Sequence, residues 1–351
     1  MSDAATPSPA PVGPAPGRAD RFQRRHPWAG FPLGVLYKFL DDQGGYLAAL
    51  ITYYGFLSLF PLLLLLVTIL GFVLEGDPSL QHRVVASALS QFPIIGTQIS
   101  QDVGSVRGSA PALGVGIVGT LYGGLGVAQA GQNAMNTVWA VPRHRRPNPI
   151  TSRVRSLGLL AILGTGVIVT TVLSGAASSG TAFGLHLGAA GKTLALAGSV
   201  AANGALFTVA FRVLTARHVG IRVVLPGALV AAVGWQILQS VGTYYLGHTL
   251  KHAKETYGLF GIVLGLVGWI YLEALLVVLC AELNVVRERR LWPRSLLTPF
   301  TDQVSLTPAD RATYTASAGA QASKGFEDID VTFRQHPHPS DPPPDRPPRD
   351  C

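Results

Sequence analysis

Long apolar segments separated by shorter polar stretches run through most of the chain. Six of them are long enough to cross a bilayer, which takes about 20 residues. They cover residues 46–74, 113–138, 157–173, 194–214, 224–246 and 258–286. The pattern predicts an all-α membrane protein with six transmembrane helices. Residues 31–42 mix apolar and charged positions, which is typical of a helix lying at the membrane interface.

Composition supports the membrane assignment and defines the ends of the domain. The 351 residues are 48% hydrophobic and only 13% charged, whereas an average soluble domain is about 25% charged. Residues 1–30 and 291–351 have no long apolar segment and contain Pro-rich stretches, so we expect disordered tails on either side of a six-helix domain over residues 31–290. Two cysteines exclude a disulfide framework.

The positive charges predict the orientation of the helices. Lys and Arg in short loops favour the cytoplasm, and in this chain they alternate from one predicted loop to the next. The basic cluster of Arg143, Arg145, Arg146, Arg153 and Arg155 lies on the predicted cytoplasmic side, as do both termini. RNA phosphates or anionic lipid headgroups are alternative partners for this cluster. We favour topology as the explanation and expect no nucleic acid partner.

Polar residues gather in the predicted cytoplasmic halves of the first, second and sixth helices. Lipid cannot satisfy such groups, so they should face the interior of the bundle. The candidate substrate pathway comprises Tyr53, Tyr54, Ser58, Pro61, Gln129, Gln132, Asn133, Asn136, Glu273, Glu282 and Asn284. The four amides from Gln129 to Asn136 share one helical face, and the kink expected at Pro61 is a candidate gate.

Two interpretations of these polar residues remain open. They could line a wet vestibule for a polar or amphiphilic substrate. Alternatively, they form hydrogen bonds between packed helices, with Glu282 paired to Arg153 or Arg155. For Glu273 we expect the vestibule, because no basic residue lies at its depth and a carboxylate there needs water or a ligand.

Other motifs predict packing and not chemistry. Gly258, Gly261, Gly265 and Gly268 form a stripe on the sixth helix that should pack against another helix, and a homo-oligomer is one such arrangement. His248, His252 and Glu255 lack a fourth metal ligand, so we expect solvated side chains. We find no residues that activate water or a nucleophile, and we expect no metal, no cofactor and no enzymatic activity.

Several short motifs resemble the YihY/BrkB family of bacterial inner-membrane proteins, formerly labelled ribonuclease BN. The resemblance covers roughly residues 34–290. Its motifs are Ala48-Ala49-Leu50, Tyr53-Tyr54, Ser58-Leu59-Phe60-Pro61, Asn136-Thr137-Val138-Trp139, Tyr257-Gly258, Trp269-Ile270-Tyr271 and Ala281-Glu282-Leu283-Asn284. Cys280 stands where the family often has Gly, and Glu273 where a smaller polar residue is usual.

The resemblance implies a six-helix protein of the inner membrane with both termini inside and a role in envelope integrity or export. We therefore expect a transporter or exporter of a lipid or small solute, in contact with the lipid bilayer. A membrane scaffold for envelope partners is the alternative. The ribonuclease label lacks residues that would carry the reaction.

Overall fold

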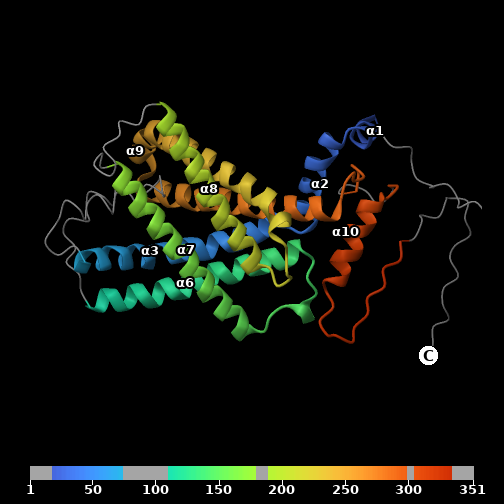
Figure 1. Ribbon diagram of the computed structural model, residues 1–351, viewed down its shortest axis with the longest axis horizontal. Helices are drawn as coiled ribbons and strands as arrows, with labels where there is room; N and C mark the ends of the chain where they lie inside the picture. Colours follow the sequence, from blue (N-terminus) through green and yellow to red (C-terminus); the bar gives the residue numbers. More distant parts are fainter. Residues whose placement is uncertain (1–17, 74–109, 179–188, 299–303, 334–351) are drawn as a thin grey trace, which may run out of the picture.

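The computed structural model describes residues 18–73, 110–178, 189–298 and 304–333; residues 65–73, 167–178, 189–196 and 243–259 are described by their backbone alone. The described secondary-structure elements are helices, and the described residues include no strand, so the prediction of an all-α membrane protein is confirmed (Figure 1). The helices are α1 (Arg18–Arg25), α2 (Pro27–Asp41), α3 (Gly44–Val73), α6 (Ala110–Val138), α7 (Pro149–Ser178), α8 (Ala189–Leu214), α9 (Ile221–Arg289) and α10 (Pro308–Gly319), with a 3₁₀ turn at Arg143–Arg145.

Five helical segments of the described residues, two of them within α9, are long and apolar enough to cross a membrane. The segments are Gly44–Leu62, Leu113–Val138, Ala197–Leu214, Ile221–Gly242 and Val263–Arg289. The remaining predicted span, residues 157–173, lies in α7, which is helical throughout this range. Its side chains beyond Gly166 lie outside the described residues, so the sixth span stays a prediction.

Helices α3 and α6 form a tightly packed antiparallel pair. A Cβ atom on Gly119 would touch Pro61, one on Gly123 would touch Ser58, and one on Gly126 would touch the Tyr54 ring. From Gly119 to Gly126 the position on α6 rises by seven residues while the contacted position on α3 falls by seven, which defines the antiparallel register. Glycine at these contacts lets the two backbones approach closely.

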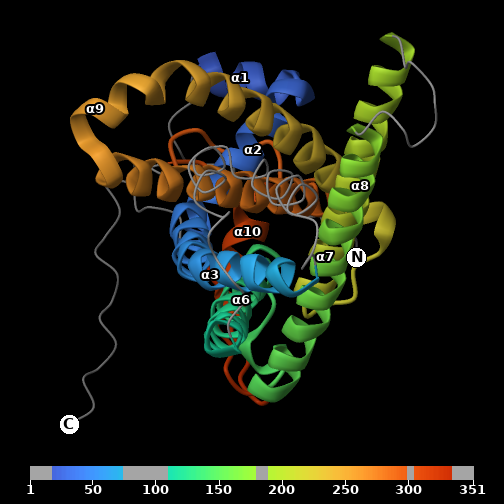
Figure 2. The same ribbon diagram turned by 90° about the vertical axis from the view of Figure 1, so that its left-hand side faces the viewer.

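Helix α9 contains both of the last two predicted spans. Figure 2 shows it arching over and returning beside its own first half. The two halves meet where Gly227 faces Asn284, Gly234 faces Leu276 and Gly242 faces Trp269. The sequence predicted a loop over residues 247–257, and this prediction is wrong, because the backbone there is helical. Polar residues mark the exit from the apolar region, but none of them has to end a helix.

The predicted tails are partly folded. Residues 18–25 form α1 and residues 27–30 begin α2, while residues 308–319 form α10. The prediction of disorder is therefore wrong for these segments, and residues 1–17 and 334–351 lie outside the described residues. Thr307 and Asp310 form a capping box with Pro308 at the first turn, which is a strong helix start. The predicted interfacial segment is helical in α2, but its place at a membrane interface stays a prediction.

The core of the described bundle lies close to its α2 end. Met135 and Val138 of α6, Phe211 of α8, and Val278 and Ala281 of α9 are buried together there. Helices α1, α2 and α10 cover this end of the bundle (Figure 1). The clusters around Lys38 and Arg294 described below involve residues of this cover.

Candidate functional site

A pocket of about 280 Å³ lies between α3, α6 and α9 and contains one carboxyl group. Glu273 lines it together with Ser58, and the other lining residues are apolar or glycine: Ile51, Gly55, Leu59, Leu62, Val127, Ile270, Ala274 and Val277. The Trp269 indole Nε1 donates a hydrogen bond of 2.8 Å to Glu273 Oε1. The two residues are one helical turn apart, so the indole holds the carboxyl group in place. Among the described residues, Glu273 forms no ion pair.

Three of the predicted pathway amides instead join helices to one another. Gln132 donates a 2.9 Å hydrogen bond to Ser156 Oγ and accepts one of 2.6 Å from Ser152 Oγ. These bonds connect α6 to α7. Asn136 Oδ1 accepts a 2.9 Å hydrogen bond from the Ala216 amide. Asn284 Oδ1 accepts a 2.8 Å hydrogen bond from the Gly227 amide. All three amides are buried, as the packing alternative predicted.

The remaining polar residues of the predicted pathway are spread over other surroundings. Gln129 and Asn133 are exposed, and Asn133 Oδ1 accepts a 3.3 Å hydrogen bond from Arg146 Nη1. Tyr53 is 62% exposed, whereas the Tyr54 ring packs where α3 meets Gly126. The structure therefore brings only Ser58 and Glu273 together in one pocket, and divides the other residues between packed and exposed positions.

Glu282 is fully buried and lies beside Lys38 of α2. Lys38 Nζ is 3.6 Å from Glu282 Oε2, hydrogen-bonds to Asp42 Oδ2, and donates 3.3 Å to the Val138 carbonyl oxygen. The predicted pairing of Glu282 with Arg153 or Arg155 is thus wrong. Lys38 belongs to the segment that was expected to lie at the membrane interface. In the structure its side chain is only 1% exposed and is buried against α9.

A second charged cluster holds the C-terminal segment against α2. Arg294 is buried; its Nε lies 2.5 Å from Asp310 Oδ1 and its Nη2 lies 2.7 Å from Asp41 Oδ2. The two carboxylates hold the pKa of Arg294 above its usual value despite the desolvation of the guanidinium. Beyond α10, the carbonyl oxygens of Ala320 and Ala322 accept 3.2 Å hydrogen bonds from the Arg143 and His144 amides. Sequence reasoning missed this cluster, although the capping signal at Thr307 marked the helix.

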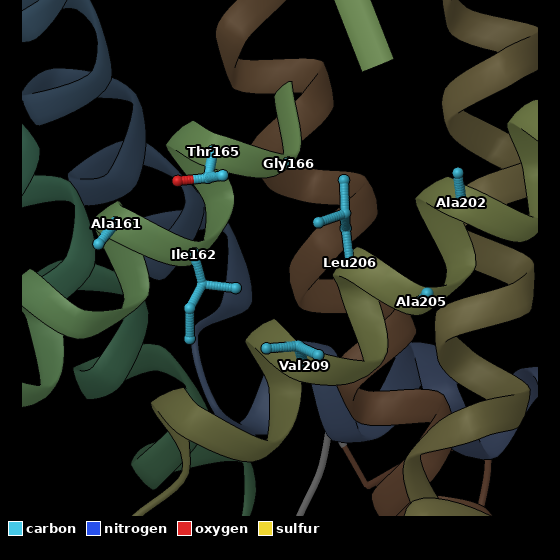
Figure 3. A pocket seen from close by; sticks show the side chains of 8 residues that line it. All are labelled: Ala161, Ile162, Thr165, Gly166, Ala202, Ala205, Leu206 and Val209. Carbon is cyan, nitrogen blue, oxygen red and sulfur yellow. The ribbon is translucent and has the colours of Figure 1, made fainter. Parts of the chain in front are cut away.

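A larger hollow lies between α7 and α8 and was not predicted. Its volume is about 650 Å³, and Figure 3 shows the side chains that line it: Ala161, Ile162, Thr165, Gly166, Ala202, Ala205, Leu206 and Val209. The Thr165 hydroxyl is its only polar side chain. The hollow can accept apolar groups but offers no charge for recognition.

The glycine stripe and the histidine group remain untested. Gly265 and Gly268 are exposed, and nothing lies within 4 Å of a Cβ atom built on Gly268. Gly258 lies outside the residues whose side-chain surroundings are described, as do His248, His252 and Glu255. The described residues include no group of three potential metal ligands. Packing through the stripe and the absence of a metal both stay predictions.

Apolar helices of spanning length around buried ionisable groups define a multi-pass helical membrane protein. Comparison with known proteins identifies the particular family. The model of the family described as "Virulence factor BrkB" matches residues 35–300, and the chain belongs to this family, as its motifs predicted.

Three curated relatives share this similarity at low identity. The chain is 26% identical to the inner membrane protein YhjD of Escherichia coli K12, over 79% of this chain and 86% of the relative. It is 24% identical to the putative ribonuclease-like protein YfkH of Bacillus subtilis 168, over 71% of this chain and 91% of the relative. It is 26% identical to a UPF0761 membrane protein of Pseudoalteromonas atlantica, over 68% of this chain and 79% of the relative. No solved structure matches the chain.

Proposed function

We propose that this membrane protein transports a lipid or small amphiphilic solute and that the Glu273 pocket is part of the substrate path. The observation that carries the proposal is a carboxyl group lining a pocket inside the spanning region. A charged or polar side chain at such a position is costly. Packing alone does not require it, because the neighbouring helices already meet through apolar residues and glycine.

The chemistry of the pocket favours an amphiphile. Aliphatic side chains surround most of its volume, whereas the Glu273 carboxyl and the Ser58 hydroxyl supply the polar groups. Such a site suits an apolar chain with a head group that donates hydrogen bonds or carries a positive charge. The volume of about 280 Å³ holds part of a lipid and not a whole one, so the rest would lie between helices or in the bilayer.

The proposal also includes an orientation in the inner membrane. The ends of α6, α8 and α9 lie at one end of the bundle, because Asn136 contacts Ala216 and Arg289 contacts the Trp139 carbonyl oxygen. Arginines of the connecting segments favour the cytoplasm for this end by the positive-inside rule. Reporter fusions after Pro142, Gly220 and Trp292 should then read as cytoplasmic, and fusions near Ser90, Gly180 and His252 as external. An odd number of crossings between the two termini would contradict this topology.

The transport activity is tested by lipid movement in proteoliposomes. The probe is phosphatidylethanolamine with a fluorescent acyl chain, whose movement between leaflets is followed by chemical quenching from outside. Wild-type protein should accelerate this movement, and Glu273→Gln should reduce the acceleration at least fivefold. Glu288→Gln, which changes an exposed carboxyl of the same helix, is the matched control and should retain it. Equal rates with and without wild-type protein would reject this lipid as a substrate and favour the scaffold alternative.

A ribonuclease function is not what we propose. One relative is named ribonuclease-like, but hydrolysis of RNA requires a group that activates water or a metal that does so. The described residues include no group of three potential metal ligands, and Arg146 of the basic loop donates hydrogen bonds to the Val141 carbonyl oxygen and to the Asn133 side chain. Purified protein should leave RNA intact. Ribonuclease activity that remains after two unrelated purification routes would overturn this expectation.

A further inference from the structure

Lys38, Asp42 and Glu282 bring one ammonium and two carboxyl groups together in a buried cluster. Their side chains are 1%, 5% and 0% exposed. Both carboxyl groups contact the same Lys38 Nζ, so they lie next to each other. With every group ionised, the cluster would carry one uncompensated negative charge. Burying such a charge is energetically costly, and proteins usually avoid it by taking up a proton.

The hydrogen bonding of Glu282 shows the same imbalance. Neither of its carboxyl oxygens has a hydrogen-bond donor, and Lys38 at 3.6 Å is too distant to be one. A buried carboxylate without a donor is a rare arrangement. A proton on either Asp42 or Glu282 would let one carboxyl donate to the other and would satisfy an oxygen of Glu282.

The Arg294 cluster is a useful comparison inside the same molecule. It also places two carboxyl groups, Asp41 and Asp310, around one cation. However, Asp310 Oδ2 accepts hydrogen bonds from the amides of Ser295 and Thr307, at 3.0 and 2.8 Å, and Asp41 is partly exposed. Donors and water compensate the negative charge there. The Lys38 cluster has neither form of compensation at Glu282.

We propose that Asp42 and Glu282 hold one proton between them, so that these two carboxyl groups and Lys38 form a proton-binding site where α2 meets α9. The proton comes from water and forms a single O–H bond, and Lys38 neutralises the carboxylate that remains. A metal ion fits less well, because the ammonium already occupies the position between the two carboxyl groups. This inference does not depend on the transport function.

The surrounding groups are consistent with proton uptake. Burial raises the pKa of Asp42, and the charge of Lys38 offsets this effect only in part. Asp41 is the neighbouring acid and is paired with Arg294. From α9, Arg289 interacts electrostatically with Asp42, and its guanidinium donates a 2.6 Å hydrogen bond to the Trp139 carbonyl oxygen.

Infrared spectroscopy tests the site directly, because a protonated carboxyl group has a carbonyl band that shifts in D₂O. The full chain is measured at neutral pH in a maltoside detergent, which has no ester carbonyl, and in a Glu273→Gln background that removes the other membrane carboxyl. We expect the intensity of one protonated carboxyl. Adding Glu282→Gln or Asp42→Asn should remove it, since one carboxylate then balances Lys38. Adding Lys38→Met should instead double it.

The controls separate this site from other carboxyl groups. Glu288→Gln should leave the band unchanged because Glu288 is exposed. A band that is absent before the Glu282 substitution, or that survives both Glu282→Gln and Asp42→Asn, would overturn the proposal. Lys38→Met is read only from protein that elutes as a single folded species, and the two carboxyl substitutions decide the outcome without it.

Discussion

The amide of Gly227 donates a 2.8 Å hydrogen bond to Oδ1 of Asn284, although 57 positions separate the two residues within one continuous helix. Pro226, next to it, cannot donate a hydrogen bond and disturbs the turn. The side chain of Asn284 thus supplies an acceptor for the amide directly after this proline. This contact fixes the register between the two halves of α9.

Gly227→Ala should destabilise the protein, because a Cβ atom would overlap the Cys280 carbonyl oxygen and the Asn284 side chain. We expect a loss of about 1 to 3 kcal/mol in the free energy of unfolding, as for other overpacked sites. Thermal unfolding in detergent measures it. Gly158→Ala is the control, since nothing lies within 4 Å of its Cβ position, and it should be neutral or slightly stabilising. Equal melting temperatures for the two variants would contradict the close contact.

Arg294→Met should release the C-terminal segment from α2. Removing one partner of a buried ion pair costs about 3 to 5 kcal/mol because the other charges stay buried without compensation. Limited trypsin digestion should therefore cut at Arg311 in α10 much faster than in the wild type. Arg290→Met, which removes an exposed charge nearby, should not change the rate. Equal cleavage of all three proteins would mean that Arg294 does not hold the segment.

Access to the Glu273 pocket can be measured with single cysteines in a background without Cys280 and Cys351. A cysteine at Glu273 should react with a membrane-impermeant thiol reagent added to the cytoplasmic side of inverted vesicles. A cysteine at Asn133 should react as an exposed control, and one at Gln132, which is 5% exposed, should not. If the cysteine at position 273 stays unreactive while that at position 133 reacts, the pocket does not open to this side.

The stability of the fold should depend on pH through Asp42. Its pKa in the folded protein is raised above the unfolded value of about 3.9, so the folded state keeps a proton that the unfolded chain has already lost. The contribution of Asp42 to the free energy of unfolding is therefore fully present below about pH 4 and is lost as the pH rises through the folded pKa. The melting temperature of the wild type should therefore fall as the pH rises from about 4 through the folded pKa of Asp42. Asp42→Asn should make this fall shallower, whereas Glu288→Gln should not. Identical slopes for Asp42→Asn and the wild type would contradict the raised pKa.

Sequence patterns predicted the membrane class and the family because both depend on local properties. Apolar length locates the spanning segments of α3, α6, α8 and α9, and the short motifs identify the family. The amides of Gln132, Asn136 and Asn284 were correctly placed in the interior of the bundle. Their partners could not be predicted, since Ser156, the Ala216 amide and the Gly227 amide come from other helices or distant turns.

Charged residues were the least predictable because their partners depend on tertiary contacts. Lys38 follows an apolar stretch and looks like an interfacial charge, yet it is buried against Glu282. Arg294 follows the last span and counts as a topological charge, yet it binds Asp41 and Asp310. Hydropathy and loop charge describe a segment and its side of the membrane. They contain no information on which distant carboxylate a cation will meet.

The contact between Lys38 and Glu282 also constrains the order of events during synthesis. Glu282 emerges about 240 residues after Lys38, which at ribosomal rates of about 5 to 20 residues per second takes roughly 10 to 50 s. During that time Lys38 has one local partner, Asp42, one helical turn ahead of it. This pair can form as soon as α2 does. The nascent chain thus carries its own temporary counter-ion for the lysine until the last helix arrives to complete the cluster.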